Sequence, residues 1–244
     1  MKNTAIEWAD NTINFYVGCT KVSEGCKNCY MYRLETRFGR DPTKVRKTNW
    51  KTIESNLNKW ESSIIFVNSM SDTFHESLST DDIWSMFRMM QFYQKHTFIV
   101  LTKRITRARL MVWSHDISIP DNVWIGTSVE SQNHVDRIEE LKQIPSKTKF
   151  VSFEPLLGKI ECDLNGIDWA IIGGESDWHP RPMKAEWVDS LFNTCKVMGV
   201  KFFFKQWGGS TKCKCHKAWG CRLYKEQTWD ERPLMKQEIS LEQQ

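Results

Sequence analysis

The chain has no long apolar run. Its 244 residues have a mean hydropathy of -0.52, and no stretch reaches the roughly 18 continuous apolar residues that a membrane-spanning helix needs. The first residues, Met-Lys-Asn-Thr-Ala-Ile-Glu-Trp, also lack the apolar segment of a secretory signal peptide. We therefore expect a cytoplasmic protein without a membrane partner.

Internal repeats, low-complexity blocks and a strong charge imbalance are also missing. The 34 basic and 30 acidic residues give a formal charge of +4 and a pI of about 8.6. This balance permits a nucleic-acid partner without requiring one, because dedicated nucleic-acid binders often exceed a pI of about 9.

The eight cysteines of the chain fall into two clusters of three and two isolated residues, Cys162 and Cys195. Disulfides are rare in reducing compartments, where clustered cysteines are more often metal ligands. We expect the two isolated cysteines to be small buried residues, because free cysteine packs well in cores.

The N-terminal cluster, Cys19, Cys26 and Cys29, has one thiol too few for a closed zinc site. A structural zinc ion takes four ligands, whereas a [4Fe-4S] cluster held by three thiolates keeps one iron open to a further ligand. The open position favours reaction chemistry over a scaffolding role.

Apolar runs alternate with amphipathic stretches along the chain. Predicted strands lie at about 15–17, 64–69, 97–102, 123–128, 149–153, 169–173 and 201–205, and predicted helices at about 80–94, 107–113, 132–143 and 185–198. Continuous apolar strands separated by helices are typical of a parallel sheet that is buried on both faces.

The pattern predicts an α/β fold, a partial or complete (β/α) barrel, with a doubly wound open sheet as the alternative. We expect one barrel domain over residues 1–209 and a short cysteine-containing extension over residues 210–244.

Nearly every predicted strand is followed by polar or charged residues at its carboxyl end. In barrels and open α/β sheets this edge binds ligands, so these residues and the three cysteines after the first strand are expected around one mouth. The candidate binding residues are Ser69, Asp72, Lys103, Arg104, Ser128, Glu130, Glu154, Gly173, Gly174, Glu175, Ser176 and Lys205.

Several motifs together resemble the three-cysteine-motif proteins of phages and bacteria. This family of uncharacterised function is radical-SAM-like, and its nearest characterised relatives lie near spore photoproduct lyase. The motifs are Ile6-Glu7-Trp8, Gly18-Cys19 through Cys29-Tyr30, Ser69 through His75, Leu101 through Arg104, Ser128-Val129-Glu130, Ser152 through Gly158, Gly173 through Ser176 and Phe204 through Gly208.

The resemblance implies that Cys19, Cys26 and Cys29 hold a [4Fe-4S] cluster whose open iron binds S-adenosylmethionine (SAM). Reductive cleavage of SAM would give a 5′-deoxyadenosyl radical that abstracts hydrogen from a nucleotide or a nucleic acid. An electron donor such as flavodoxin or ferredoxin and a bacterial or phage-infected host cell are implied as well.

The spacing here is C-x6-C-x2-C, longer at its first gap than the usual C-x3-C-x2-C of radical SAM enzymes. By charge, Lys103 or Arg104 suits the carboxylate of SAM, and Glu130, Glu154 or Glu175 suits its amino or ribose groups.

The C-terminal cluster, Cys213, Cys215, His216 and Cys221, has enough ligands for zinc or for part of a second iron-sulfur cluster. Unligated thiols in a surface loop are the alternative. Two other functions remain open: a non-enzymatic zinc-bearing nucleic-acid-binding protein, and a cluster-containing redox or sensing protein that does not bind SAM.

Overall fold

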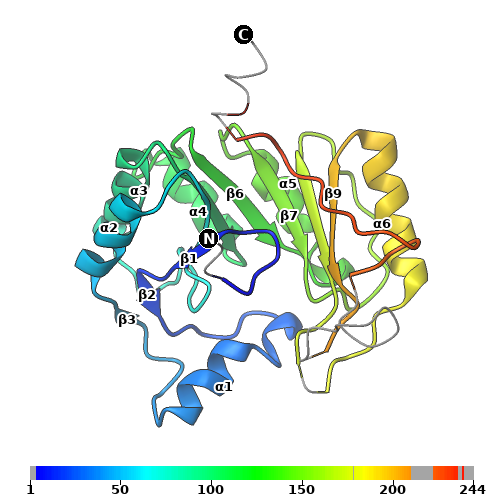
Figure 1. The fold of residues 1–244 in the computed structure, drawn as a ribbon, viewed down its shortest axis with the longest axis horizontal. Helices are drawn as coiled ribbons and strands as arrows, with labels where there is room; N and C mark the ends of the chain where they lie inside the picture. Colours follow the sequence, from blue (N-terminus) through cyan, green and yellow to red (C-terminus); the bar gives the residue numbers. More distant parts are fainter. Residues whose placement is uncertain (1–3, 178, 210–221, 236–237, 239–244) are drawn as a thin grey trace.

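The structure is a computed structural model, and it describes residues 4–177, 179–209, 222–235 and 238. Seven parallel strands form one sheet in the order β1-β4-β5-β6-β7-β8-β9. They are β1 Asn11–Ile13, β4 Ile64–Val67, β5 Thr97–Thr102, β6 Val123–Ser128, β7 Lys149–Phe153, β8 Trp169–Gly173 and β9 Lys201–Gln206. Within the described residues no pairing joins β1 to β9, so the sheet curls into an open, partial barrel (Figure 1).

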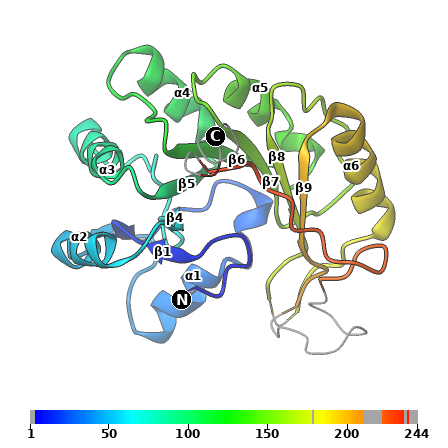
Figure 2. The same cartoon turned by 45° about the horizontal axis from the view of Figure 1, so that its top comes forward.

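Helices surround the convex side of the sheet, as Figure 2 shows. They are α2 Trp50–Lys59, α3 Thr80–Phe92, α4 Ile105–Trp113, α5 Asp136–Lys142 and α6 Ala185–Met198. Helix α1, Tyr30–Arg37, lies apart from this ring, below the carboxyl ends of the strands (Figure 1). The short elements are β2 Tyr16–Val17, β3 Arg46–Lys47, and the 3-10 helices η1 Glu24–Cys26 and η2 Gln132–His134.

Local chemistry fixes where the helices begin and end. Helix α3 begins at a capping box, in which the Ser79 hydroxyl accepts from the Asp82 backbone N–H and the Asp82 carboxylate accepts from Ser79. Helix α6 ends at Gly199, whose φ of 69° is the left-handed conformation that favours glycine. These signals therefore separate each helix from the neighbouring strand.

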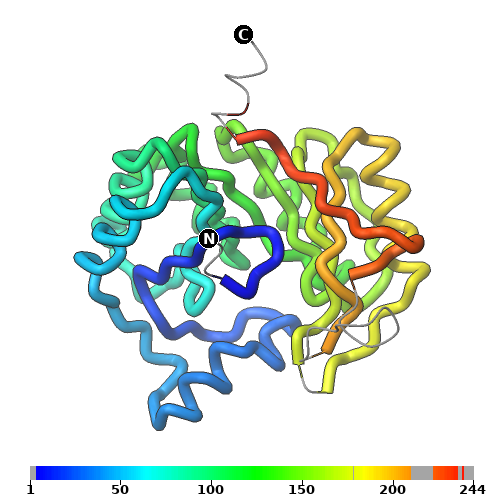
Figure 3. Tube along the Cα trace, in the orientation of Figure 1, coloured from blue at the N-terminus to red at the C-terminus, as the bar shows by residue number. Residues whose placement is uncertain are grey.

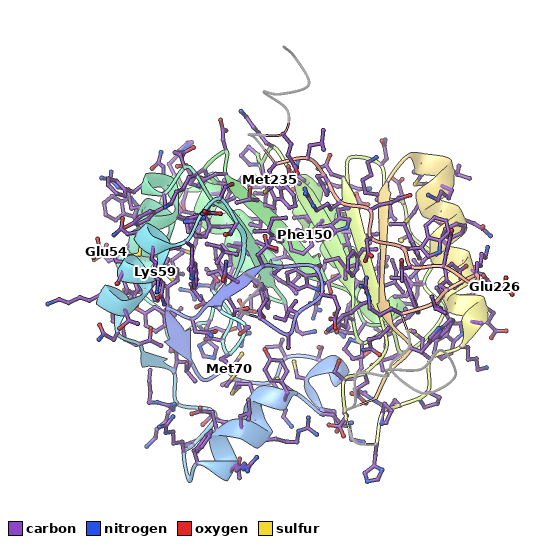
Figure 4. All side chains as sticks on the ribbon, viewed as in Figure 1. Glu54, Lys59, Met70, Phe150, Glu226 and Met235 are labelled. Atoms are coloured by element: carbon purple, nitrogen blue, oxygen red, sulfur yellow. The ribbon has the colours of Figure 1, made fainter. Side chains whose placement is uncertain are left out.

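The curled sheet has a different hydrophobic cluster on each face. On the convex face, alternate strand residues pack against the helices. On the concave face, strand residues such as Phe150, labelled in Figure 4, pack around Trp169, and Trp8 from the N-terminal segment packs there too. Trp8 lies edge-on to Phe66 of β4 and Trp169 of β8, with ring centroids 4.6 and 6.3 Å away. The N-terminal segment therefore fills the inside of the partial barrel.

The predicted α/β class and partial barrel are confirmed. The strands follow chain order and the helices cover only the convex face, which excludes the doubly wound alternative, because that fold has helices on both faces. The position of the first strand was wrong. Residues 15–17 do not enter the sheet: Tyr16 and Val17 pair with the antiparallel strand β3, and Asn11–Ile13 pairs with β4 instead.

Residues 222–235 run back along the sheet, as the orange and red trace in Figure 3 shows. The Trp169 indole N–H donates to the backbone oxygen of Glu231 at 2.8 Å, and the Glu231 carboxylate accepts from Phe202 N at 2.9 Å.

The predicted C-terminal cluster, Cys213, Cys215, His216 and Cys221, lies outside the described residues. The division into residues 1–209 and 210–244 stays a prediction. None of the described helices combines the length and apolarity of a membrane span.

Trp169 is the central ring of the concave face and is fully buried. Its replacement by alanine should lower the free energy of unfolding by about 3–5 kcal/mol, because a large cavity forms and the Glu231 contact is lost. Urea denaturation followed by circular dichroism measures this change. Trp84→Ala, at a half-exposed helix position, is the control and should cost much less; equal losses would contradict the assignment of Trp169 to the core.

Candidate active site

The carboxyl ends of the strands surround a cavity of about 280 Å³. Its lining includes all three N-terminal cysteines. It also includes ten of the twelve candidate binding residues: Ser69, Asp72, Lys103, Arg104, Ser128, Glu154, Gly174, Glu175, Ser176 and Lys205. The other two lie just outside the lining, Glu130 paired with Lys103 and Gly173 against Lys205 and Glu154. The structure thus brings the predicted residues to one mouth.

Residues 18–29, which contain Cys19, Cys26 and Cys29, form a loop that we call the cysteine loop. Hydrogen bonds of Gly18 join it to the segment after β4. Gly18 N donates to the Met70 oxygen at 3.0 Å, and the Ser71 hydroxyl donates to the Gly18 oxygen at 2.7 Å. Gly18 has a φ of +107°, and a Cβ there would lie 2.3 Å from the Lys44 oxygen. Only glycine fits this entry to the loop.

A buried ion pair holds the first part of the loop. The Arg104 guanidinium pairs with Asp72 at 3.2 Å and also donates to the Thr20 hydroxyl at 2.8 Å and to Cys19 Sγ at 3.7 Å. Asp72 in turn accepts from the Thr102 hydroxyl at 2.7 Å. Arg104 therefore links the ends of β4 and β5 to the first cysteine, and its charge is used within the protein.

A second buried carboxylate holds the middle of the loop. Glu130 is 0% exposed, forms an ion pair with Lys103, accepts from Arg137 at 3.1 Å, and accepts from the Ser23 hydroxyl at 2.9 Å. Both Lys103 and Glu130 are thus neutralised by each other and by neighbouring side chains.

A third carboxylate, Glu175, holds the end of the loop. It accepts from the Asn28 amide at 2.9 Å and forms a bidentate ion pair with Arg181, whose guanidinium also reaches the Glu24 oxygen at 3.0 Å. Burial opposes ionisation of Glu175, but the hydrogen bonds from Arg181 lower its pKa below the usual range. Arg181 follows β8 in a loop, and no sequence signal distinguished it.

A further ion pair lines the cavity, in addition to that of Arg104 and Asp72. Lys205 of β9 pairs with Glu154, which follows β7, and both side chains line the cavity. An apolar wall of the cavity is formed by Ile6, Trp8, Phe66 and Leu101, which belong to the concave-face cluster. These four residues were not predicted at the site, although Ile6, Trp8 and Leu101 lie in motifs of the family resemblance.

The three thiols have different acidities. Burial, with smaller effects from Asp72 and Cys26, raises the pKa of Cys19 to about 12. Burial also raises the pKa of Cys29. Burial opposes ionisation of Cys26 too, but the Lys103 ammonium and hydrogen bonds from the loop backbone lower its pKa. A metal that bound here would have to displace protons from the two less acidic thiols.

The donor set fits a group with three thiolate ligands. Among the cavity-lining residues that the structure describes there are three cysteines and no histidine. Nowhere in the described part of the chain are three His, Cys, Asp or Glu side chains arranged to hold a metal ion. The three thiols thus line one cavity without converging on a single metal-binding point.

Gly25, inside the loop, lies against Glu130. A Cβ at this position would be 2.4 Å from Glu130 Cγ and 2.5 Å from Oε1, and the buried carboxylate cannot move without losing its partners. Gly25→Ala should therefore lower the free energy of unfolding by about 1–3 kcal/mol in urea denaturation. Gly158→Ala is the matched control, because its Cβ would meet nothing within 4 Å; equal stability of the two variants would refute the contact.

Comparison with solved structures finds spore photoproduct lyase. A cysteine-to-serine mutant is 12% identical with a TM-score of 0.48, covering 80% of this chain and 63% of that chain. A complex of the lyase with dinucleoside spore photoproduct is 12% identical with a TM-score of 0.47, and the match covers 80% of this chain and 65% of that chain. A double mutant of the lyase with bound AdoMet and dinucleoside spore photoproduct is 12% identical with a TM-score of 0.48. That match covers 81% of this chain and 64% of that chain.

The chain thus spans less than two thirds of the length of these lyases. No curated protein matches the sequence. Residues 3–233 match the profile of the family described as "Protein of unknown function (DUF5131)". Because this match covers nearly the whole sequence, the chain belongs to the DUF5131 family.

Proposed function

We propose that this protein is a radical SAM enzyme, in which Cys19, Cys26 and Cys29 hold a [4Fe-4S] cluster and the cavity binds SAM beside it. The observation that carries the proposal is that three thiols of one loop line a single cavity at the carboxyl edge of a parallel sheet. Three thiolates leave one iron of such a cluster open.

When bound, such a cluster supplies the electron that cleaves SAM to a 5′-deoxyadenosyl radical. The protein then has to bind, orient and exclude water. The apolar wall around Trp8 and Phe66 keeps water from the inner side of the cavity. Lys205 and Glu154, which pair with each other, offer opposite charges to the carboxylate and amino groups of SAM, whereas Arg104 and Glu130, the partner of Lys103, also bond to the cysteine loop.

The substrate in this proposal is a nucleotide or a nucleic acid, and the electron comes from a carrier such as flavodoxin or ferredoxin. The motif resemblance to three-cysteine-motif proteins of phages and bacteria supports the assignment. The free thiols at the cavity suit a reducing cytoplasm. A second metal site at Cys213, Cys215, His216 and Cys221 stays a separate prediction.

Loss of one cysteine ligand should abolish the chemistry. Anaerobically reconstituted protein should contain about four irons per chain and form 5′-deoxyadenosine from SAM and a reductant. Cys26→Ala should lose both properties, whereas Cys162→Ala, a thiol outside the cavity, should keep them. A colourless, zinc-loaded wild-type protein that leaves SAM intact would refute the proposal and favour the zinc-bearing alternative.

Arg104 should hold the cluster through Cys19. Arg104→Lys keeps the positive charge but loses the forked contacts to Thr20 and Cys19, so a chelator should remove iron about 10-fold to 100-fold faster. Iron release is followed by the absorbance of the chelate. The matched control is Arg109→Lys, which changes a helix arginine paired with Glu140; similar release rates in both variants would contradict the role of Arg104.

A further inference from the structure

Residues 21–51 are one of two strongly basic segments of the chain. Residues 21–51 contain nine basic and three acidic residues, whereas the rest of the chain contains 25 basic and 27 acidic residues. The segment therefore has a net charge of +6 from nine basic and three acidic residues; the other basic stretch, residues 201–225, has seven basic and no acidic residues and lies partly outside the described residues.

The segment lies at the mouth of the cavity. It contains the cysteine loop from Lys21, helix α1, strand β3 and the start of α2. Figure 1 shows α1 below the carboxyl ends of the strands, and Cys26, Cys29 and Tyr30 of this segment line the cavity. In the side-chain view, Met70, another cavity residue, lies between α1 and the sheet (Figure 4).

Most of the basic side chains in the segment are available to a partner. Eight of the nine basic residues are exposed: Lys21, Lys27, Arg33, Arg37, Arg40, Lys44, Lys47 and Lys51. The three acidic residues give little compensation, because Glu35 is buried against Arg46 and Glu24 is bonded to His134. Three of the exposed cations also pair with carboxylates, Arg33 with Asp177, Arg40 with Glu35 and Lys47 with Asp82, so the surface keeps a positive charge that is only partly compensated.

Apolar side chains lie between these charges along one side of α1. Tyr30, Leu34 and Phe38 follow each other at intervals of four residues and are 38%, 38% and 64% exposed. Tyr30 lines the cavity, so this row leads outward from it. The Arg40 guanidinium lies 5.6 Å from the centroid of the Phe38 ring. An exposed ring beside arginines is typical of a surface on which bases stack.

We propose that residues 21–51 form a docking surface for single-stranded nucleic acid, which lies along α1 with an unpaired nucleotide directed into the cavity. This deepens the proposed function, on which it rests, by naming the substrate as a polymer and the surface that holds it. A single strand fits better than a duplex, because only an unstacked nucleotide reaches an enclosed site. The exposed apolar row is too small for the core of a standard protein interface.

The test measures binding of fluorescent 20-nucleotide single strands of DNA and of RNA to the reconstituted protein at several salt concentrations. The mouth variant is Arg37→Gln, Arg40→Gln and Lys44→Gln together. Its matched control is Lys59→Gln, Arg88→Gln and Lys147→Gln, which removes the same charge from exposed positions outside the segment. The mouth variant should reduce the slope of log Kd against log salt by about 2, whereas the control should leave it unchanged.

Phe38→Ala should weaken binding about tenfold at every salt concentration without changing the slope, because it removes a stacking contact and no charge. Binding of either strand supports the docking surface, and the strand that binds more tightly shows whether the surface prefers the sugar of DNA or that of RNA. Equal binding of poly-glutamate, or equal effects of the mouth and control variants, would overturn the proposal. Iron content and SAM cleavage are measured on the same samples, so a missing cluster is distinguished from a missing docking surface.

Discussion

The buried ion pair between Arg104 and Asp72 is the constraint on which the site depends. Asp72 follows β4 and Arg104 follows β5, and the guanidinium also contacts Thr20 and Cys19 of the cysteine loop. One interaction therefore fixes two neighbouring strand ends and the first thiol relative to each other. A buried pair of this kind loses several kcal/mol when one partner is removed, because the other charge is left without compensation in a medium of low polarity.

Two further carboxylates, Glu130 and Glu175, hold the rest of the loop in the same way. The three anchors come from three different strand ends, so the loop closes over the concave side of the sheet instead of extending into solvent. This arrangement uses most of the charges at the carboxyl edge. Lys205 and Glu154 line the same cavity as a further ion pair.

The sequence predicted the class of fold because its strands are continuous apolar runs with clear boundaries. The ranges of β5, β6, β7 and β8 agree with the predicted ones to the residue. The first strand was misplaced because Asn11–Ile13 is short and carries polar residues, so its apolar signal is weaker than that of Phe15 to Val17. Pairing with β4 gave it a place in the sheet that its own composition does not indicate.

By itself the sequence determined that three thiols and many polar residues follow parallel strands, since the carboxyl ends of such strands meet at one edge. It did not determine which of these charges pair with each other. The tertiary structure pairs Lys103 with Glu130, Arg104 with Asp72 and Lys205 with Glu154. That choice depends on which side chains face each other across the curl of the sheet, and a linear pattern of residues does not contain this information.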